Sequence, residues 1–305
     1  MLLTQGLGKD FGERRAVDAL DLEVGDGTIV GLLGPNGAGK TTAISMISGV
    51  LTPTRGTAAI GGIDVRRDPI GAKRRLGLVP QDLALYEDLS ARDNLHFFGR
   101  LAGMRGGALA SAVAFGLDLA GLADRAADRV SSFSGGMKRR LNLAAGLLHK
   151  PRLAILDEPT VGVDPQSRAH IFDVVRRMNQ DERMTIVYTS HYMEEVEALC
   201  PRVAILDHGR LVADDAVADL VARHADGSVE VLADVVPADA AARLATLGET
   251  IVTGNRLRVR TKRSLGEVAT ALEGAGIEAR SIARHRPDLE AVFLSLTGRS
   301  LRDES

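Results

Sequence analysis

One Gly-rich stretch has the residue types and spacing that suit phosphate chemistry. The stretch "GPNGAGKTT", residues 34–42, fits the pattern G-x-x-x-x-G-K-[ST] between an apolar run and a helix-like segment. Glycines let consecutive backbone N–H groups face one anion, the lysine adds positive charge for the outer phosphates, and the first threonine hydroxyl can ligate Mg2+. The flanks favour this interpretation over a plain Gly-rich turn. We therefore predict a nucleoside triphosphate site formed by Gly34, Pro35, Asn36, Gly37, Ala38, Gly39, Lys40, Thr41 and Thr42.

A second stretch, "PRLAILDEPT" at 151–160, is an apolar strand that ends in two carboxylates. The carboxyl ends of parallel strands form the ligand crevice of such a sheet, so Asp157 and Glu158 should emerge beside the Gly-rich loop. We predict that Asp157 holds Mg2+, directly or through water, and that Glu158 is the general base for the attacking water. The alternative is a solvated acidic turn. The apolar strand before the pair and Pro159 after it favour the chemical role.

A third stretch, "SSFSGGMKRR" at 131–140, predicts a bare helix start. The run after Ser134 has helical periodicity and must stop before Pro151. Ser134, Gly135 and Gly136 would thus lie at a helix N-terminus, where unpaired N–H groups and a positive partial charge suit an anion. The loop at 34–42 already accounts for one phosphate site, so the question is which phosphate this second helix start contacts.

Composition limits the classes of function. The 305 residues suffice for one large core or two modest ones, and 45% hydrophobic with 26% charged content is typical of a globular protein. No apolar run approaches the roughly 18 residues of a membrane-spanning helix, and the N-terminus does not look like a secretory signal. The single cysteine, Cys200, fits a reducing cytoplasm. A net charge of −2 gives no general attraction to nucleic acid, so none is expected as a partner.

These stretches occur in an order that resembles a known family. With "KDFGERRAV", "LGLVPQD", "VGVDP" and "YTSHYMEEVE", the chain over about residues 1–220 resembles the nucleotide-binding subunit of an ATP-binding cassette (ABC) transporter. The tail "PDLEAVFLSLTGRSLRD" resembles the C-terminus of daunorubicin-resistance-type subunits, which serve ABC-2 exporters. The resemblance implies an α/β fold: a P-loop ABC cassette with a RecA-like core and a helical subdomain at about 82–133.

The resemblance also implies roles for four further residues. Phe11 would stack on adenine, Gln81 would contact Mg2+ or its water and sense the membrane partner, Asp164 would be the D-loop aspartate, and His191 the switch histidine near the γ-phosphate. Taken singly, Phe11 suits a core, Gln81 a loop, and His191 a polar helix start. Asp164 could cap the helix that begins near Pro165, and this is compatible with a role between subunits.

For the third stretch, the resemblance implies an intersubunit role. The signature "FSGGM" of one subunit would close over ATP held by the Gly-rich loop of another, so a lone chain would hold half a site. Phe133 and Met137 replace the Leu and Gln of the commonest signature, whereas Ser134-Gly135-Gly136 is intact. The resemblance therefore implies the γ-phosphate contact but not the ribose-side contact of the fifth signature residue, which is Met137 here. Such variants occur in the branch of the family that has separate ABC-2-type permeases.

Beyond about residue 220 the composition changes. Short strand-like runs alternate with two helical segments in the order βαββαβ, which predicts a small ferredoxin-like accessory domain over 221–305 after a nucleotide-binding domain over 1–220. The tail carries a helical stripe that is typical of a docking face, made of Leu289, Val292, Phe293 and Leu296.

The combined expectation is an ATPase that uses ATP and Mg2+ as a subunit of an ABC exporter. It would dimerise with itself or a close relative, lie on the cytoplasmic side of the cell membrane, and energise efflux of a drug, antibiotic, lipid or polysaccharide-like substrate through an ABC-2-type permease. The alternative is a soluble ABC ATPase that acts on ribosomes or DNA. Such proteins usually carry two cassettes, a long coiled coil or basic extensions, and the sequence shows none of these.

Overall fold

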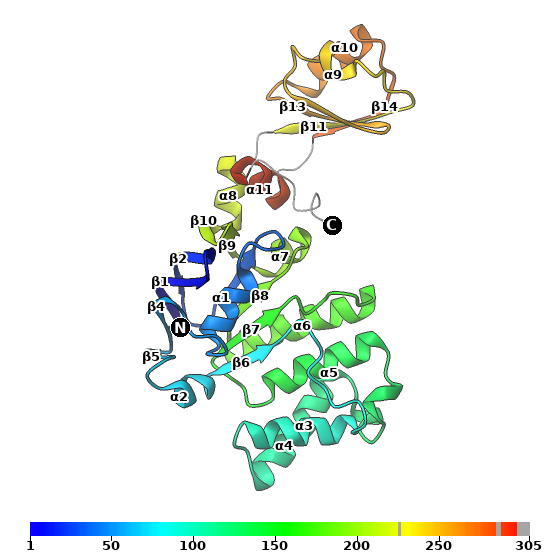
Figure 1. The fold of residues 1–305 in the computed structure, drawn as a ribbon. Coiled ribbons are helices and arrows are strands. Elements are labelled where there is room, and N and C mark those ends of the chain that lie inside the picture. Colours follow the sequence, from blue (N-terminus) through cyan, green and yellow to red (C-terminus); the bar gives the residue numbers. More distant parts are fainter. Residues whose placement is uncertain (225–226, 285–287, 298–305) are drawn as a thin grey trace. The chain divides into compact units, whose positions relative to one another are not determined.

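The computed structural model describes residues 1–224, 227–284 and 288–297 (Figure 1). The chain divides into two compact units, the first formed by Met1–Val217 and the second beginning at Ala218. Each unit has a hydrophobic core of its own.

A six-stranded sheet is the centre of the first unit. Five of its strands are parallel, and the sixth, β10, is antiparallel at one edge. Every residue of β3, β7 and β8 is buried, as expected for central parallel strands that are covered on both faces. In sheet order the strands are β10 (Arg210–Ala216), β9 (Arg202–Asp207), β3 (Ile29–Leu33), β8 (Thr185–Thr189), β7 (Leu153–Asp157) and β6 (Leu76–Val79).

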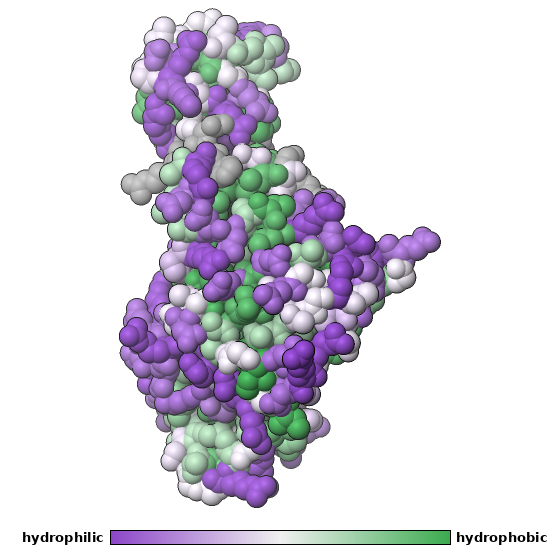
Figure 2. Space-filling model, turned by 90° about the vertical axis from the view of Figure 1, so that its left-hand side faces the viewer, coloured by the Kyte–Doolittle hydropathy of each residue, from purple (hydrophilic) through white to green (hydrophobic). Residues whose placement is uncertain are grey.

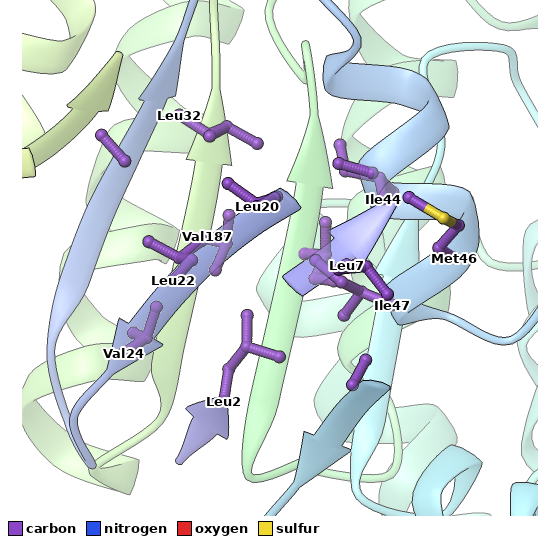
Figure 3. Close-up of a cluster of buried hydrophobic side chains, with 14 of the residues drawn as sticks. Leu2, Leu7, Leu20, Leu22, Val24, Leu32, Ile44, Met46, Ile47 and Val187 are labelled. Carbon is purple, nitrogen blue, oxygen red and sulfur yellow. The ribbon is translucent and has the colours of Figure 1, made fainter. Parts of the chain in front are cut away.

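A second, antiparallel sheet packs against this centre. Buried and exposed residues alternate along most of β2, which is typical of a strand with one face on a core. Helix α1 (Lys40–Ile47) shares that core with β1, β2 and the central strands, through side chains that include Ile44, Met46 and Ile47 (Figure 3). The strand order is β2 (Arg14–Val24), β1 (Leu2–Phe11), β4 (Arg55–Ile60) and β5 (Ile63–Asp64).

The remaining helices of the first unit include the predicted helical region. Helices α3, α4 and α5 pack on one another, and α5 also packs on α6. Among the described residues, no helix is long and apolar enough to cross a bilayer. The face of the molecule drawn in Figure 2 shows both hydrophilic and apolar side chains. The helices are α2 (Pro69–Lys73), α3 (Ala91–Leu101), α4 (Gly106–Ala120), α5 (Gly135–Leu147), α6 (Pro165–Glu182) and α7 (Met193–Leu199), with 3-10 turns at Ala123–Arg125 and Val130–Ser132.

The second unit confirms the predicted order βαββαβ. Its antiparallel sheet has the strand order β12-β13-β11-β14, and the two helices between its strands complete the ferredoxin-like pattern. Apolar residues of the sheet and of both helices form one core. The elements are α8 (Val217–His224), β11 (Ser228–Ala233), α9 (Ala240–Arg243), β12 (Thr250–Thr253), β13 (Arg256–Arg260), α10 (Leu265–Gly274), β14 (Ala279–Arg284) and α11 (Leu289–Thr297).

Helix α11 corrects one expectation. Leu289, Val292 and Phe293 are fully buried within the single chain and so are not available as an exposed docking face, whereas Leu296, the fourth residue of the stripe, is half-buried. Their helical spacing identified an apolar face correctly, but the chain itself covers that face. The end of the predicted tail, 298–303, lies outside the described residues.

Candidate functional site

The Gly-rich loop connects the carboxyl end of β3 to the first residue of α1. Gly39 precedes α1 with a φ of 103°, and a Cβ atom there would lie 2.5 Å from the carbonyl oxygen of Ala16. Only glycine suits both the left-handed backbone and this close approach. No side chain caps α1, so its first N–H groups remain available to an anion.

The loop forms one wall of a cleft of about 180 Å³. The predicted Gln81 and Glu158 line the same cleft, so segments that are far apart in the sequence meet here as expected. Gly34, the first residue of the loop, is buried and is not among the residues that line the cleft. Arg14 and Ala16 line the cleft as well; sequence reasoning missed them, although both fall in the quoted stretch "KDFGERRAV". The loop residues in the lining are Pro35, Asn36, Gly37, Ala38, Gly39, Lys40, Thr41 and Thr42.

A larger hollow, of about 630 Å³, is lined mainly by charged residues. None of the predicted site residues, all of which the structure describes, is among its lining residues. Asp18 there accepts hydrogen bonds from Arg210 at 2.9 Å and from Arg15 at 3.2 Å. These charges neutralise one another, so the smaller cleft, with its bare helix start, is the better candidate for chemistry.

Lys40 lies between the loop and the acidic end of β7. Its side chain is 7% exposed, and Nζ donates hydrogen bonds to the carbonyl oxygens of Gly34 at 2.5 Å and Pro35 at 3.1 Å. Burial lowers the pKa of Lys40, whereas the nearby carboxylates of Glu158 and Asp157 raise it. The cation is therefore held where the outer phosphates of a nucleotide would meet it.

Asp157 ends β7 and is nearly buried. Burial raises the pKa of its carboxyl group, and the hydrogen bond from Thr189 Oγ1 to Asp157 Oδ1, at 2.7 Å, acts in the opposite direction. The adjacent Glu158 has a left-handed backbone, with a φ of 46°, and its N–H donates to Thr189 Oγ1 at 2.9 Å. Such a conformation costs about 1–3 kcal/mol in a residue other than glycine and is common at functional sites. Thr189 on β8 thus supports both acids.

His191 follows β8 and meets Glu158. The distance from His191 Nδ1 to Glu158 Oε2 is 3.2 Å, and the imidazole is 37% exposed. The ring also packs against Tyr192, with ring centroids 4.1 Å apart. The structure therefore brings the predicted general base and the predicted switch histidine together at the carboxyl ends of β7 and β8.

Gln81 is exposed beyond β6, and a residue that sequence reasoning missed holds its backbone. The guanidinium of Arg139 donates to the carbonyl oxygen of Gln81 and, at 3.3 Å, to that of Val161. Burial lowers the pKa of Arg139, while Asp82 and Glu158 raise it. Its helical spacing from the buried Gly136 and Leu143 could have placed Arg139 on the inner face of α5.

The predicted signature begins α5 and touches the start of α6. Ser134 caps α5 by accepting the N–H of Met137 at 3.3 Å, and Ser134 and Gly135 are exposed. A Cβ atom on Gly136 would overlap Ser167 Oγ and lie 2.7 Å from Asp164 Oδ2. Asp164 in turn caps α6 by accepting the Ser167 N–H at 2.9 Å.

Several predicted residues lie away from the cleft lining. The structure describes all of the predicted residues, and those outside the cleft lining include Ser134, Gly135, Gly136, Asp157, Asp164 and His191. Phe11 is also outside the lining: it ends β1, is 50% exposed, and has Lys9 Nζ at 5.3 Å from its ring centre. The single chain therefore brings the phosphate loop, Gln81 and Glu158 to one cleft but leaves the signature outside its lining.

Together, the parallel sheet, the glycine loop that opens α1, and the acidic end of β7 define a P-loop nucleoside-triphosphate-binding cassette. The profile of the family described as ABC transporter matches residues 17–161. The linearmycin resistance ATP-binding protein LnrL of Bacillus subtilis is 41% identical over 99% of this chain and 100% of its own length. The daunorubicin resistance ATP-binding protein DrrA3 of Streptomyces coeruleorubidus is 40% identical over 97% of this chain and 96% of its own.

Solved structures agree on the fold. An ATP-binding subunit of an ABC transporter, 27% identical, matches 73% of this chain and 92% of its own with a TM-score of 0.66. A dimeric ATP-binding cassette bound to ADP and Pi in a post-hydrolysis state, 23% identical, matches 71% of this chain and 98% of its own with a TM-score of 0.65. The chain belongs to the ABC transporter family, as an ATP-binding subunit with ATPase activity. These relatives do not support the alternative of a soluble ATPase that acts on ribosomes or DNA.

Proposed function

We propose that this chain is the ATP-hydrolysing subunit of an exporter and lies on the cytoplasmic side of the cell membrane against a separately encoded ABC-2-type permease. The pairing of Glu158 with His191 beside the phosphate loop carries the hydrolytic part of the proposal. The names of the relatives support the direction of transport, because they include linearmycin and daunorubicin resistance and Nod factor export. The transported molecule would thus be a drug, an antibiotic, a lipid or a polysaccharide-like compound.

At the cleft, the chain's own residues have separable tasks. Lys40 and the N–H groups of the loop bind the outer phosphates, Phe11 stacks on adenine, and Glu158 takes a proton from the attacking water. His191, at hydrogen-bonding distance from Glu158, orients that carboxylate toward the γ-phosphate. The left-handed backbone of Glu158 supports this assignment, since such strain is typical of functional sites.

The residues also fit Mg2+, which would neutralise charge on the outer phosphates. The exposed Thr41 hydroxyl, the Asp157 carboxylate and the Gln81 amide offer the oxygen ligands that this ion prefers. Among the described residues, no three His, Cys, Asp or Glu side chains gather as a complete metal site. In the usual Mg2+ arrangement, one or two carboxylates bind the ion together with substrate phosphates.

We further propose that the complete site forms between two copies of this chain, or between this chain and a close relative. The cleft of about 180 Å³ is smaller than the roughly 300–1,000 Å³ of pockets that enclose a ligand. Ser134 and Gly135 are exposed at the start of α5 and stand apart from the cleft lining. Closure of this helix start over the partner's γ-phosphate would use the anion preference of a helix N-terminus.

A mixing experiment tests the two-chain site. Gly135→Asp places a negative charge where the partner's phosphate would bind, and a Cβ atom at Gly135 meets nothing within 4 Å, so the fold should tolerate it. Lys40→Ala spoils the phosphate loop. Each variant alone should be inactive, whereas a mixture should recover part of the ATPase activity, because the mixed dimer keeps one site with an intact loop and an intact signature.

A control mixture makes this result specific. Lys40→Ala mixed with Glu158→Gln should stay inactive. Each chain then carries a substitution on the side of its site that holds the phosphate loop, so no intact site forms. If the Gly135→Asp mixture recovers no more activity than this control, the two-chain proposal is wrong. The proposed place against a permease is tested by fractionation: the chain should be recovered with membranes only when its permease is present.

A further inference from the structure

A buried carboxylate lies behind the predicted catalytic turns. Glu195 is on α7, and its side chain is 2% exposed. Carboxylates are seldom buried unless other groups satisfy their charge, and leaving one unpaired is strongly destabilising. The groups that surround Glu195 therefore indicate what the residue does.

Three hydroxyl groups donate hydrogen bonds to the same oxygen, Glu195 Oε2. They come from Thr160 at 2.7 Å, Tyr188 at 2.9 Å and Ser190 at 2.9 Å, and all three donor residues are buried. Burial and the Glu195 carboxylate together raise the pKa of Tyr188, which keeps that hydroxyl protonated as a donor. Hydrogen bonds to a charged acceptor in a dry interior are strong and directional. Oε2 therefore joins two backbone segments, the turn that follows β7 at Thr160 and the end of β8 at Tyr188 and Ser190.

Two of these donors belong to the predicted catalytic turns. Thr160 is two residues after Glu158 in the turn that follows β7, and Ser190 directly precedes His191. Ser190 Oγ also accepts the N–H of Tyr192 at 2.9 Å, so it fixes the backbone on the other side of His191. Glu195 is therefore connected to both residues of the Glu158–His191 pair without touching either.

The other carboxylate oxygen faces α6. Arg168 Nε lies 3.3 Å from Glu195 Oε1, and among the described residues neither of these buried atoms has an aligned hydrogen bond. Arg168 is in the first turn of α6, the helix that Asp164 caps. The same guanidinium lies 5.4 Å from the ring centre of Tyr192, beside His191. One carboxylate thus contacts the three segments that carry Glu158, His191 and Asp164.

We propose that Glu195 is a positioning residue for ATP hydrolysis: it holds the Glu158 turn, the His191 turn and the start of α6 in one arrangement. The inference rests on the roles proposed above for Glu158 and His191. Glu158 has a left-handed backbone that surrounding contacts must hold in place. Thr189 provides one such contact at the N–H of Glu158, and Glu195 provides a second through Thr160.

The main test is Glu195→Gln in the full-length chain. The amide keeps the shape of the side chain but loses the charge that binds three hydroxyls and faces Arg168. We expect kcat for ATP hydrolysis to fall about 10-fold or more, because small misplacement of reacting groups can lower a rate by roughly 10²-fold. The ATP dissociation constant should stay within about twofold, since Glu195 touches no residue of the phosphate loop.

Three matched variants separate positioning from fold stability. Thr160→Val, Ser190→Ala and Tyr188→Phe each remove one hydroxyl from the same Oε2 atom. The first two cut the links to the catalytic turns, whereas Tyr188 lies within β8. We expect Thr160→Val and Ser190→Ala to lower kcat several-fold and Tyr188→Phe to leave it near wild type, whatever the order of their melting temperatures. Losses of kcat that simply follow the loss of melting temperature would mean that Glu195 is only structural.

Hydrogen exchange gives a measurement independent of turnover. In Glu195→Gln, the amides of Glu158 and Tyr192 should exchange faster, while the amide of Ala43, which donates to Gly39 in the phosphate-loop helix, should not change. Unchanged exchange together with unchanged kcat would overturn the inference. If Glu158→Gln is inactive in the same assay, the proposed function still stands; if Glu158→Gln hydrolyses ATP normally, it is the proposed function that fails.

Discussion

At Gly136, α5 packs closely on the start of α6, and one added methyl group tests that packing. The Cβ atom of Gly136→Ala would overlap Ser167 Oγ and lie 2.7 Å from Asp164 Oδ2. Both atoms belong to the cap of α6, in which Ser167 Oγ donates to Asp164 Oδ2 at 2.8 Å. Alanine can therefore be accommodated only if the cap moves. The predicted contact of Gly136 with a phosphate is a separate reason for a glycine here. It does not account for the short distances to Ser167 Oγ and Asp164 Oδ2.

The size of the effect follows from these contacts. Overpacking a close contact costs about 1–3 kcal/mol, and a lost helix cap costs about 0.5–2 kcal/mol. Alanine returns up to about 1 kcal/mol through its better helix propensity. We therefore expect the free energy of unfolding to fall by about 2 kcal/mol. For a unit of this size, each kcal/mol shifts the melting temperature by about 2–4 °C, so the expected loss is about 6 °C.

Thermal unfolding of two neighbouring variants checks this reasoning. Gly135→Ala is the control, because its Cβ atom meets nothing within 4 Å and alanine favours the helix. It should melt at or slightly above the wild-type temperature. Equal melting temperatures for Gly135→Ala and Gly136→Ala would refute the close packing of α5 on the cap of α6.

Three further predictions concern the acids and the second unit. Glu158→Gln should keep ATP affinity while turnover falls by about 10²-fold or more; near-normal turnover would remove Glu158 as the general base. Burial raises the pKa of Asp157 in the folded chain above its ordinary 3.8. The free energy of unfolding should therefore fall as the pH rises from 3.8 through the pKa of the folded chain, because the folded state then loses a proton that it binds more tightly than the unfolded state. Asp157→Asn should abolish this loss, so it should melt above wild type at pH 7 but not at low pH, and it should lose Mg2+-dependent hydrolysis. A chain that ends at Val217 should melt cooperatively and bind ATP in calorimetry, since the second unit has its own core; loss of binding in the folded truncation would contradict this.

The elements that carry the phosphate loop and the acids could be predicted because their signals are local. The β3 run "IVGLL" carries no polar side chain and leads directly into the Gly-rich loop, and the β7 run "LAILD" ends on its acid. The rule that ligands bind at the carboxyl ends of parallel strands then places both at one edge. The strand and helix order of the second unit follows from the same short-range periodicity.

Contacts between distant segments could not be predicted in the same way. Arg139 holds the carbonyl of Gln81, 58 positions away, and Thr160 donates to Glu195, 35 positions away. The residues next to Arg139 and Glu195 in the sequence give no sign that either side chain is buried. A buried charge is explained by the groups that contact it in the fold, and these come from distant segments. The stripe on α11 shows a related limit. Periodicity identifies an apolar face, but it does not tell whether the chain itself or another molecule covers that face.

Lys40→Met gives the most direct test of where the outer phosphates bind. Methionine nearly keeps the length of the side chain but removes the cation, together with the hydrogen bonds to Gly34 and Pro35. A hydrogen bond to a charged group contributes about 1.5–3 kcal/mol, so ATP should bind on the order of 10- to 100-fold more weakly. ATP at 100 times the wild-type dissociation constant should stabilise the wild-type chain by about 2.7 kcal/mol, but a variant weakened 100-fold by only about 0.4 kcal/mol. At the 10-fold end of the range the variant would still gain about 1.4 kcal/mol. The ATP-dependent rise in melting temperature should therefore fall by about half or more in Lys40→Met and persist in Lys150→Met, which removes an exposed cation that pairs with Glu182. An undiminished rise in Lys40→Met would place the outer phosphates elsewhere in the molecule.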